Sequence, residues 1–410
     1  MTKLKSEFLN ILESRGFYYQ CTDLAGLDLA FQTVKPLPAY IGFDVTADCL
    51  HIGSLVQIMM LYWLQQTGGK PIVVLGGGTT KVGDPSGKDA SRKLLNQTTI
   101  DHNKQSIEQL LSQFIQFGND ANDAMMIDNA QWLDELNYID VLRDVGPLIT
   151  INRMLTFDSV KSRLTREQPL TFLEFNYMIL QAYDFYELNK RYNCHLQLGG
   201  ADQWGNIVSG IDLTRKKSQK TVYGYTVPLI TTSAGQKMGK TANGAIWLKE
   251  PQTSSYDFWQ FWRNTPDNDV IRFLKLFTTI PLDEIERLAQ LQGQDINVAK
   301  ILLANSVTAF CHGQSAAADA EKTANQTFSE GGMGQNLPSE TILADIALTD
   351  VLIKLNFSTS KSSARRLIIG GGVRIESVKI QDENHIIKHT PGSNYRLSVG
   401  KKRHAIIKSQ

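Results

Sequence analysis

The sequence predicts an α/β protein with a doubly wound parallel sheet in residues 1–253, followed by an α-helical segment and a small α+β module. In the first part, short apolar runs that end in glycine alternate with helical patterns, which is typical of parallel strands joined by crossover helices. In 254–330, apolar residues recur at three- and four-residue spacing, which indicates helices. A glycine-rich polar stretch, 331–345, then reads as a linker before a tail, 346–410, whose short alternating runs indicate strands.

The composition is that of a globular chain without a membrane segment. Hydrophobic residues make up 42% and charged residues 20%, and no apolar run is long enough to span a bilayer. The first residues, MTKLKSEFLNILESRGF, mix acidic side chains into an amphipathic pattern, unlike a signal or transit peptide. We therefore expect a cytoplasmic protein.

The cysteines and histidines lack the spacing of a metal site. Cys21, Cys49, Cys194 and Cys311 form no CxxC pair, and the histidines other than His51 are scattered. We expect free thiols in a reducing compartment, no zinc and no other protein-bound metal.

Charge is unevenly distributed along the chain. Residues 346–410 hold 12 Lys and Arg against 4 Asp and Glu, a balance of +8, whereas the remainder holds 30 against 37, a balance of −7. A basic tail on an acidic body indicates a module that binds a polyanion.

The stretch 40–55, YIGFDVTADCLHIGSL, predicts a strand that leads directly into a helix. Its first residues alternate in the manner of a strand. Thr46 and Asp48 have the side chains of helix caps, so we expect them to cap a helix that begins near Leu50.

The start of this helix has the composition of a phosphate site. His51 and Ser54 are three residues apart and would lie on one side of the helix, with Gly53 allowing close approach between them. A helix N-terminus with these groups favours a phosphate chain. An ordinary strand-to-helix turn is the alternative for this stretch taken alone.

The remaining elements of the first part follow in alternation. We expect a helix after His51 that stops at Gly68-Gly69, a strand over 71–78, helices over 103–117 and 133–145, a strand over 193–200 and a helix from Gln203. Ligands bind at the carboxyl ends of the strands in a doubly wound sheet. His51, Asp84 and Gln203 each follow such a strand, which places them at that edge.

The stretch GGGTTKVGDPSGK is similar to a P-loop but fails its spacing. A P-loop would need glycine in place of Val82 and serine or threonine in place of Asp89. Asp84 is therefore better interpreted as a polar group that faces a ligand amine.

A second phosphate-binding candidate is the sequence KMGKT at 237–241, far along the chain from HIGS at 51–54. This pair resembles the HIGH and KMSKS motifs of the class I aminoacyl-tRNA synthetases. GDPSGK from Gly83, EFNYMILQAYDF from Glu174 and LGGADQWGN from Leu198 narrow the resemblance to the bacterial-type tyrosyl-tRNA synthetases, over nearly the whole chain. Ser54 and Gly239 depart from the motifs, where the family has histidine and serine.

This resemblance implies both a domain organisation and an activity. Residues 1–253 would form a Rossmann-like catalytic domain, with the HIGH-like segment at 45–54 and the KMSKS-like segment at 237–241, before a helical domain and an S-four-type RNA-binding domain. The family activates L-tyrosine with ATP, releasing pyrophosphate, and transfers tyrosine to the 3′ end of tRNA(Tyr). The resemblance also implies a homodimer, and Mg²⁺ is expected to accompany ATP.

Roles in the reaction with ATP are carried over residue by residue. By resemblance, the catalytic side chains that contact or approach the phosphates would be Thr46, His51, Lys88, Arg92, Lys237 and Lys240. The ATP-binding set would be Gly42, Asp44, His51, Ser54, Gly200, Asp202 and Lys240. The reaction itself needs in-line positioning and stabilisation of charge on the phosphates, which loop lysines can supply. A solvated turn is the alternative for KMGKT alone.

The amino-acid pocket would be formed around one helix. Tyr177, Gln181 and Asp184 are spaced four and three apart, so they lie on one helical face. By resemblance, the tyrosine-binding set would be Tyr40, Asp84, Tyr177, Gln181, Asp184 and Gln203. Among these, Asp184 and Tyr40 would bind the phenolic hydroxyl, and Asp84, Tyr177 and Gln181 the ammonium. Buried polar groups of this kind reject an amino acid that lacks the hydroxyl, as is known for tyrosyl-tRNA synthetases. An exposed polar helix face is the alternative.

The tail carries a candidate RNA-binding face. Lys361, Arg365 and Arg366 form a cationic surface on a short helix that precedes short strands, similar to the S-four-type RNA-binding fold. A solvated charged face is the alternative.

Two rival functions are a tryptophanyl-tRNA synthetase, which Tyr40 with Asp184 disfavours, and a catalytically silent RNA-binding protein on a synthetase scaffold.

Overall fold

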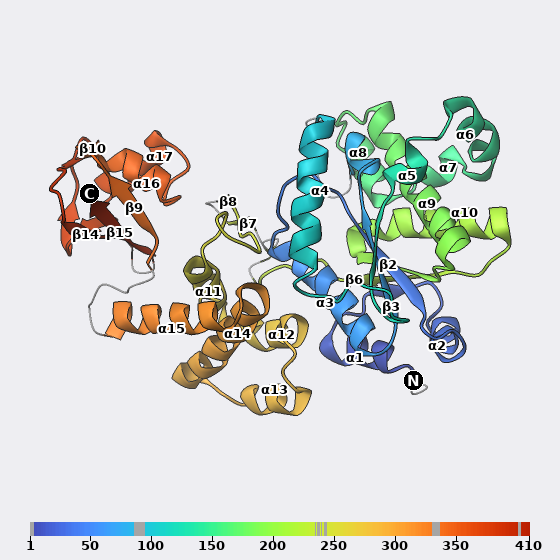
Figure 1. The fold of residues 1–410 in the computed structure, drawn as a ribbon, viewed down its shortest axis with the longest axis horizontal. Coiled ribbons are helices and arrows are strands. Elements are labelled where there is room, and N and C mark those ends of the chain that lie inside the picture. Colours follow the sequence, from blue (N-terminus) through green and yellow to red (C-terminus); the bar gives the residue numbers. More distant parts are fainter. Residues whose placement is uncertain are drawn as a thin grey trace. The chain divides into compact units, whose positions relative to one another are not determined.

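The computed structural model describes residues 4–85, 95–233, 235, 238, 240–241, 244–329, 337–400 and 403–410. The chain divides into two compact units. One comprises Met1–Thr231 with Lys275–Phe277, and the other comprises Thr232–Leu274 with Thr278–Gln410. The first unit contains the parallel sheet, and the second contains the helical segment and the basic tail (Figure 1).

The described part of the first unit is built on a six-stranded sheet whose strand order reverses in the middle. Its strands are β1 (Gln20–Cys21), β2 (Pro38–Phe43), β3 (Lys70–Leu75), β4 (Met125–Asp128), β5 (Leu196–Gly200) and β6 (Tyr223–Val227), in the order β1-β6-β5-β2-β3-β4. All neighbours are parallel except β1, which pairs antiparallel with β6. The predicted doubly wound parallel sheet is confirmed, and β2 and β5 flank its switch point, where such sheets bind ligands.

Helices connect and cover these strands. The longer ones are α1 (Glu7–Arg15), α2 (Leu24–Thr33), α3 (Ile52–Gln66), α4 (Gln97–Leu111), α9 (Phe172–Tyr192) and α10 (Trp204–Ser218). The shorter ones are η1 (Thr79–Lys81), α5 (Ala130–Leu133), α6 (Tyr138–Asp144), η2 (Gly146–Leu148), α7 (Ile151–Met154), α8 (Asp158–Thr165) and η3 (Ala201–Gln203). Helices α9 and α10 pack along each other (Figure 1).

Helix α3 begins at Ile52, later than predicted, and its cap is His51. The His51 Nδ1 accepts a hydrogen bond from the backbone N–H of Gly53 at 2.9 Å. Thr46 and Asp48, the expected caps, lie in the loop before the helix, so that prediction was wrong. The predicted stop is correct, because α3 ends at Gln66 and Gly68 adopts a left-handed φ of 80°.

Two other predicted helices have different bounds. The helix expected over 103–117 is α4, which starts six residues earlier because the Asn96 side chain caps it through the Thr99 N–H at 2.8 Å. The helix expected over 133–145 is split into α5 and α6. Asn137 caps α6 through the N–H of Ile139 at 2.9 Å and separates the two pieces.

Helix α9 covers the face of the sheet that carries Tyr40. Its start is fixed by a capping box, in which Thr171 and Glu174 each bond the other's backbone N–H. Phe185 and Leu188 of α9 are buried in one core cluster with Tyr40 and with Val74 of β3. This packing holds the polar face of α9 against the switch point of the sheet.

The second unit contains a group of helices and a small hairpin. The helices are α11 (Ser255–Arg263), α12 (Asp267–Phe277), α13 (Leu282–Leu288), η4 (Gly293–Asp295), α14 (Ile296–His312) and α15 (Gln314–Ser329), and the hairpin strands are β7 (Lys240–Thr241) and β8 (Gly244–Ala245). Helix α11 packs on both α14 and α15. In the described part of the chain, no helix is both long and apolar enough to cross a membrane.

The tail forms a second sheet with its own core. Its elements are β9 (Ser339–Ile342), β10 (Ile346–Ala347), α16 (Leu348–Lys354), α17 (Lys361–Ile369), β11 (Val373–Ile375), β12 (Val378–Ile380), β13 (Ile386–Ile387), β14 (Asn394–Val399) and β15 (Arg403–Ser409). The sheet order is β12-β11-β14-β15-β9, and buried residues from Ile342 to Ile407 pack in one cluster. Strand β9 lies within the stretch 331–345 that was predicted as linker, but it pairs in parallel with β15, so the folded tail extends back to Ser339.

Candidate active site

A cavity of about 160 Å³ opens at the switch point of the parallel sheet. It is lined by the ends of β2, β3 and β5, by one face of α9 and by the segment that follows β3. Nine residues predicted from the sequence line it: Tyr40, Gly42, Asp44, Asp84, Tyr177, Gln181, Asp184, Asp202 and Gln203. Segments that are far apart in sequence are therefore brought to the sheet edge where the strand rule expects a ligand.

The deep end of the cavity presents a carboxylate and a hydroxyl. Asp184 is 4% exposed, and its two oxygens accept hydrogen bonds from Asn129 Nδ2 at 2.9 Å and Trp132 Nε1 at 2.7 Å. Tyr40 is 1% exposed, and its hydroxyl has no hydrogen-bond partner among the residues that the structure describes. A buried hydroxyl without a partner is costly, so a ligand that supplies one would bind favourably here.

Burial shifts the pKa values of both groups at this end of the cavity. Burial, with the Asp44 and Asp128 carboxylates, raises the pKa of Asp184 to about 7 against the hydrogen bonds from Asn129 and Trp132. Burial and the nearby Asp184 raise the pKa of the Tyr40 hydroxyl well above its usual range. Both donors to Asp184 are neutral, so within the described part of the chain no partner cation compensates its charge directly.

Asn129 and Trp132 were not predicted from the sequence. Asn129 follows β4 and is held on both sides, since its Oδ1 accepts from the Gly78 N–H at 2.8 Å while its Nδ2 donates to Asp184. The strand rule could have found it, because it comes directly after the end of a parallel strand. Trp132 has no such signal, since only the packing of α5 brings it to α9.

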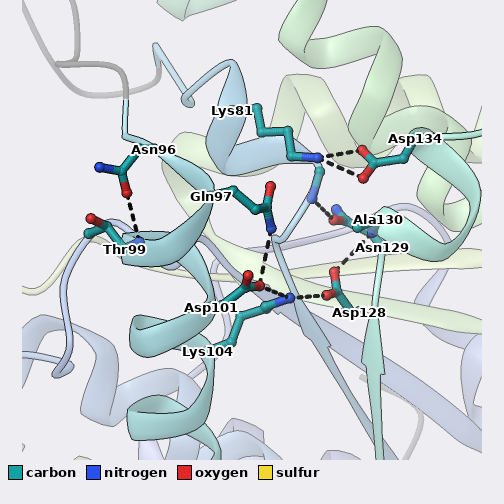
Figure 2. A network of polar contacts seen from close by, with 11 residues as sticks. Lys81, Asn96, Gln97, Thr99, Asp101, Lys104, Asp128, Asn129, Ala130 and Asp134 are labelled. Atoms are coloured by element: carbon teal, nitrogen blue, oxygen red, sulfur yellow. Dashed lines mark hydrogen bonds and ion pairs between the residues drawn. The ribbon is translucent and has the colours of Figure 1, made fainter.

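The loop after β4 is anchored by a polar network that Figure 2 shows around Lys104. The Lys104 ammonium lies 2.8 Å from Asp101 and 2.8 Å from Asp128, and Asp128 also accepts from the N–H of Ala130 at 2.9 Å. Because Asp128 precedes Asn129, this network fixes the start of α5 and the position of Asn129.

A second polar group lies across the cavity. Gln203 Nε2 donates to Asp84 Oδ2 at 2.8 Å, and Asn206 Nδ2 donates to both Gln203 Oε1 at 3.0 Å and Gln181 Oε1 at 2.9 Å. Asp84 follows Gly83, whose left-handed φ of 86° turns the chain toward the cavity. This chain of amides orients three predicted residues, and Asn206, which joins them, was not predicted.

Asp44 and Tyr177 are directly linked. The Tyr177 hydroxyl donates to Asp44 at 3.2 Å, and Thr79 Oγ1 donates to the same carboxylate at 2.9 Å. Tyr177, which was predicted to bind tyrosine, thus contacts Asp44, which was predicted to bind ATP.

The glycines near the cavity differ in what surrounds them. A Cβ at Gly42 would have no neighbour closer than the Val74 carbonyl oxygen at 4.0 Å, so protein packing does not require glycine there. A Cβ at Gly76, by contrast, would lie 2.5 Å from Thr79 Oγ1. A Cβ at Gly200 would lie 2.6 Å from Asp202 Oδ1. Gly200 does not line the cavity itself but directly follows the lining residue Gly199 in the sequence.

The remaining predicted phosphate contacts do not line this cavity. Thr46 is exposed in the loop before α3, and His51 and Ser54 are partly buried at the start of that helix. Because His51 Nδ1 accepts a hydrogen bond, neutral His51 carries its proton on Nε2. Lys88, Arg92 and Lys237 lie outside the described residues, as does the side chain of Lys240, whose backbone is in β7.

The predicted cationic residues of the tail lie on the exposed side of α17. Lys361 forms an ion pair with Asp350 at 2.8 Å, and Arg365 lies 3.9 Å from Glu383. Arg366 is also exposed on this helix. In the described ranges, no group of three or more His, Cys, Asp or Glu side chains is arranged to hold a metal ion.

The family described as "tRNA synthetases class I (W and Y)" matches residues 32–329. The chain belongs to this family. The stretch matched includes every residue that lines the cavity and each strand of the six-stranded sheet except β1.

Full-length relatives are found among the bacterial members of this synthetase family. The tyrosine–tRNA ligase of Zymomonas mobilis is 56% identical over 411 residues and that of Brucella abortus 52% over 418, each match covering 100% of both chains. A solved structure, a C-terminally truncated mitochondrial tyrosyl-tRNA synthetase from Aspergillus nidulans, has a TM-score of 0.70 and 32% identity, covering 80% of this chain and 95% of that one. The predicted resemblance to the bacterial-type tyrosyl-tRNA synthetases is confirmed.

Proposed function

We propose that this chain is a tyrosine–tRNA ligase, which activates L-tyrosine with ATP and transfers it to the 3′ end of tRNA(Tyr). The observation that carries this proposal is the deep end of the cavity, where buried Asp184 and the partnerless Tyr40 hydroxyl face one space. Full-length relatives with this activity support it.

The phenol of tyrosine would complete the hydrogen bonding of this end. Its hydroxyl donates to the Asp184 carboxylate and accepts from Tyr40, which gives Tyr40 the partner that it lacks. Phenylalanine would leave the Tyr40 hydroxyl without a partner, at a cost of about 1–3 kcal/mol, and would give the buried Asp184 carboxylate no hydrogen bond beyond those from Asn129 and Trp132. Tryptophan presents an indole N–H in a different position, and it offers no acceptor to Tyr40.

The amino-acid backbone would lie against the second polar group. The ammonium is placed near the Asp84 carboxylate, with Gln181 and the Tyr177 hydroxyl beside it. Gln203 faces the substrate carboxylate and is oriented by Asp84 and Asn206. This orientation leaves a carboxylate oxygen free to attack.

In the first step, that oxygen attacks the α-phosphorus of ATP, the bond to the bridging oxygen breaks, and pyrophosphate leaves. Gly42, Asp44, Gly200 and Asp202 would hold the nucleoside, and the space beside Gly42 allows its close approach. Thr46, His51 with its Nε2 proton, and Ser54 would contact the phosphates, and Lys88, Arg92, Lys237 and Lys240 would supply positive charge to them. Mg²⁺ would enter bound to ATP.

In the second step, a hydroxyl of the terminal ribose of tRNA attacks the carbonyl carbon of the adenylate and AMP leaves. The tail would hold the tRNA elsewhere, through Lys361, Arg365 and Arg366 and its +8 balance. Its sheet, helix α17 and separate core fit the S-four-type module expected from the sequence.

A homodimer is proposed from the exposed apolar side chains of the first unit. Within the described residues, large exposed hydrophobic side chains concentrate between 138 and 173, including Ile139, Ile151 and Phe172, which are 58%, 64% and 69% exposed. A concentration of exposed apolar side chains is typical of a segment that contributes to a protein interface. Sedimentation of the wild type and of an Ile151→Asp variant tests it, and a monomeric wild type would refute the dimer.

The activity is tested by ATP–pyrophosphate exchange with each of the twenty amino acids, followed by charging of tRNA. Tyrosine alone should support rapid exchange. Exchange with tryptophan would favour the rival synthetase, and exchange with none would favour a silent RNA-binding protein.

A further inference from the structure

The indole of Trp132 is held between two residues of helix α9 that are two turns apart. Asp184 accepts the indole N–H at 2.7 Å, and the guanidinium carbon of Arg191 lies 5.3 Å from the centre of the same ring. Residues seven apart lie on one helical face, so one stripe of α9 contacts both the edge and the face of the indole. Trp132 itself is 2% exposed.

Arg191 is fixed in this position by a buried acid. Its Nε donates to Glu187 Oε2 at 2.6 Å, and the Glu187 side chain is only 3% exposed. The hydrogen bond to Glu187 raises the pKa of Arg191 above its usual value, so the guanidinium is charged at any working pH. Its position over the ring therefore does not depend on an exposed, mobile partner.

We propose that Arg191 is a positioning residue for tyrosine recognition, acting through Trp132 on Asp184. A cation over an indole is attracted to the ring and draws electron density from it, which strengthens the N–H as a donor. The stronger donor holds the Asp184 carboxylate in the orientation that meets the phenolic hydroxyl. This inference rests on the proposed role of Asp184 in reading that hydroxyl.

The ordinary alternative is that Arg191 only stabilises the end of α9, where a cation favours the helix dipole. Lys190 is the matched control for this alternative. It lies in the same last turn and 3.6 Å from the same Glu187, but its ammonium lies over the Tyr186 ring and not over Trp132.

The test measures kcat and KM for tyrosine and phenylalanine by ATP–pyrophosphate exchange in Arg191→Met, Arg191→Lys and Lys190→Met. Arg191→Met should raise the KM for tyrosine about two- to fivefold, with kcat and the constants for phenylalanine unchanged. Arg191→Lys should restore part of this loss, and Lys190→Met should match the wild type. Equal effects of Arg191→Met and Lys190→Met, or equal effects on both amino acids, would overturn the proposal.

A double-mutant cycle with Trp132→Phe tests the route through the indole. Phenylalanine has no N–H, so Arg191→Met should have no further effect on selectivity in that background. If Arg191→Met changed the selectivity as much in the Trp132→Phe background as in the wild type, the proposal would be overturned. If Arg191→Met does not fold, as judged by its thermal unfolding, Arg191→Lys and Arg191→Gln take its place in the same cycle.

Asp184→Ala separates this inference from the proposed function. If that variant keeps the tyrosine preference, the role of Asp184 fails and the inference fails with it. If it loses the preference while Arg191→Met keeps it, only the inference fails.

Discussion

At the scale of single residues, Asp184 is placed where folding and recognition make opposite demands. Burial of its carboxylate raises its pKa to about 7, against the hydrogen bonds from its two neutral donors. An ionised acid in this position destabilises the fold, yet an ionised acid is the better acceptor for a phenol. In the proposed function, the protein thus holds a costly charge at the point where it would discriminate tyrosine from phenylalanine.

This cost predicts a pH-dependent stability. Because the pKa of Asp184 is higher in the folded chain, its stabilising contribution is complete at low pH and is lost as pH rises through about 7. Asp184→Asn cannot ionise, so between pH 5 and pH 8 its free energy of unfolding should improve relative to the wild type by about 2–3 kcal/mol. Urea unfolding without substrates measures this, and a difference independent of pH would contradict the assigned ionisation.

Gly42 offers a second prediction at this scale. Among the described residues, the Cβ of Gly42→Ala would meet no atom closer than the Val74 carbonyl oxygen at 4.0 Å, so the free energy of unfolding should change by less than about 0.5 kcal/mol, while the added methyl group should raise the KM for ATP about tenfold. Gly76→Ala is the contrasting variant, since its Cβ would overlap Thr79 and cost about 1–3 kcal/mol of stability. An unchanged KM for ATP in Gly42→Ala would remove this glycine from the nucleotide site.

At the scale of elements, His51 joins helix structure to chemistry. Its Nδ1 caps α3, so the neutral imidazole carries its proton on Nε2, the group proposed to contact a phosphate. The sequence led to Thr46 and Asp48 as caps because they are the usual capping types, and histidine is not. Only the backbone path of the loop before α3 decides which side chain reaches the Gly53 N–H.

Two substitutions separate the two roles of His51. Asparagine is a good cap, so His51→Asn should keep the stability, whereas His51→Ala should lose about 1 kcal/mol. Both variants lack the imidazole N–H, and both should form tyrosyl-adenylate more slowly in single-turnover assays. A normal rate in His51→Asn would show that the cap is the only role of the residue.

At the scale of the whole molecule, recognition of small substrates and of RNA are assigned to separate parts. The cavity is lined wholly by residues of the first unit, and the tail has its own buried cluster between Ile342 and Ile407. The mitochondrial relative was crystallised as a C-terminally truncated chain.

A chain that ends at Glu330 tests this separation. Pyrophosphate exchange should stay close to that of the full chain, while tRNA binding should weaken and show a shallower dependence on salt, by roughly one unit of slope for each lost phosphate contact. Neutralising Lys361, Arg365 and Arg366 together should reproduce part of the loss. Equal slopes for the full and shortened chains would assign the tRNA contacts to the catalytic part.

An element could be predicted from the sequence where the interactions that form it involve residues close together in the chain. Strand β3 could be predicted because a strand buried on both faces must be apolar along its length, and α9 because its polar face repeats at helical spacing. Strand β9 could not, since its polar sequence SETI becomes a strand only by pairing with β15, far along the chain. For the same reason Trp132 escaped prediction, because only tertiary packing brings it to Asp184, whereas Asn129 directly follows β4 and could have been found by the strand rule.

The most direct test of the account is the ratio of kcat/KM for tyrosine over phenylalanine in Asp184→Ala, measured by pyrophosphate exchange. Removing the carboxylate removes both the attraction for the phenol and the penalty for its absence. The account predicts that the ratio falls by at least about a hundredfold, mainly through weaker use of tyrosine. A ratio equal to that of the wild type, in a variant that still folds, would contradict the assignment of this cavity to tyrosine.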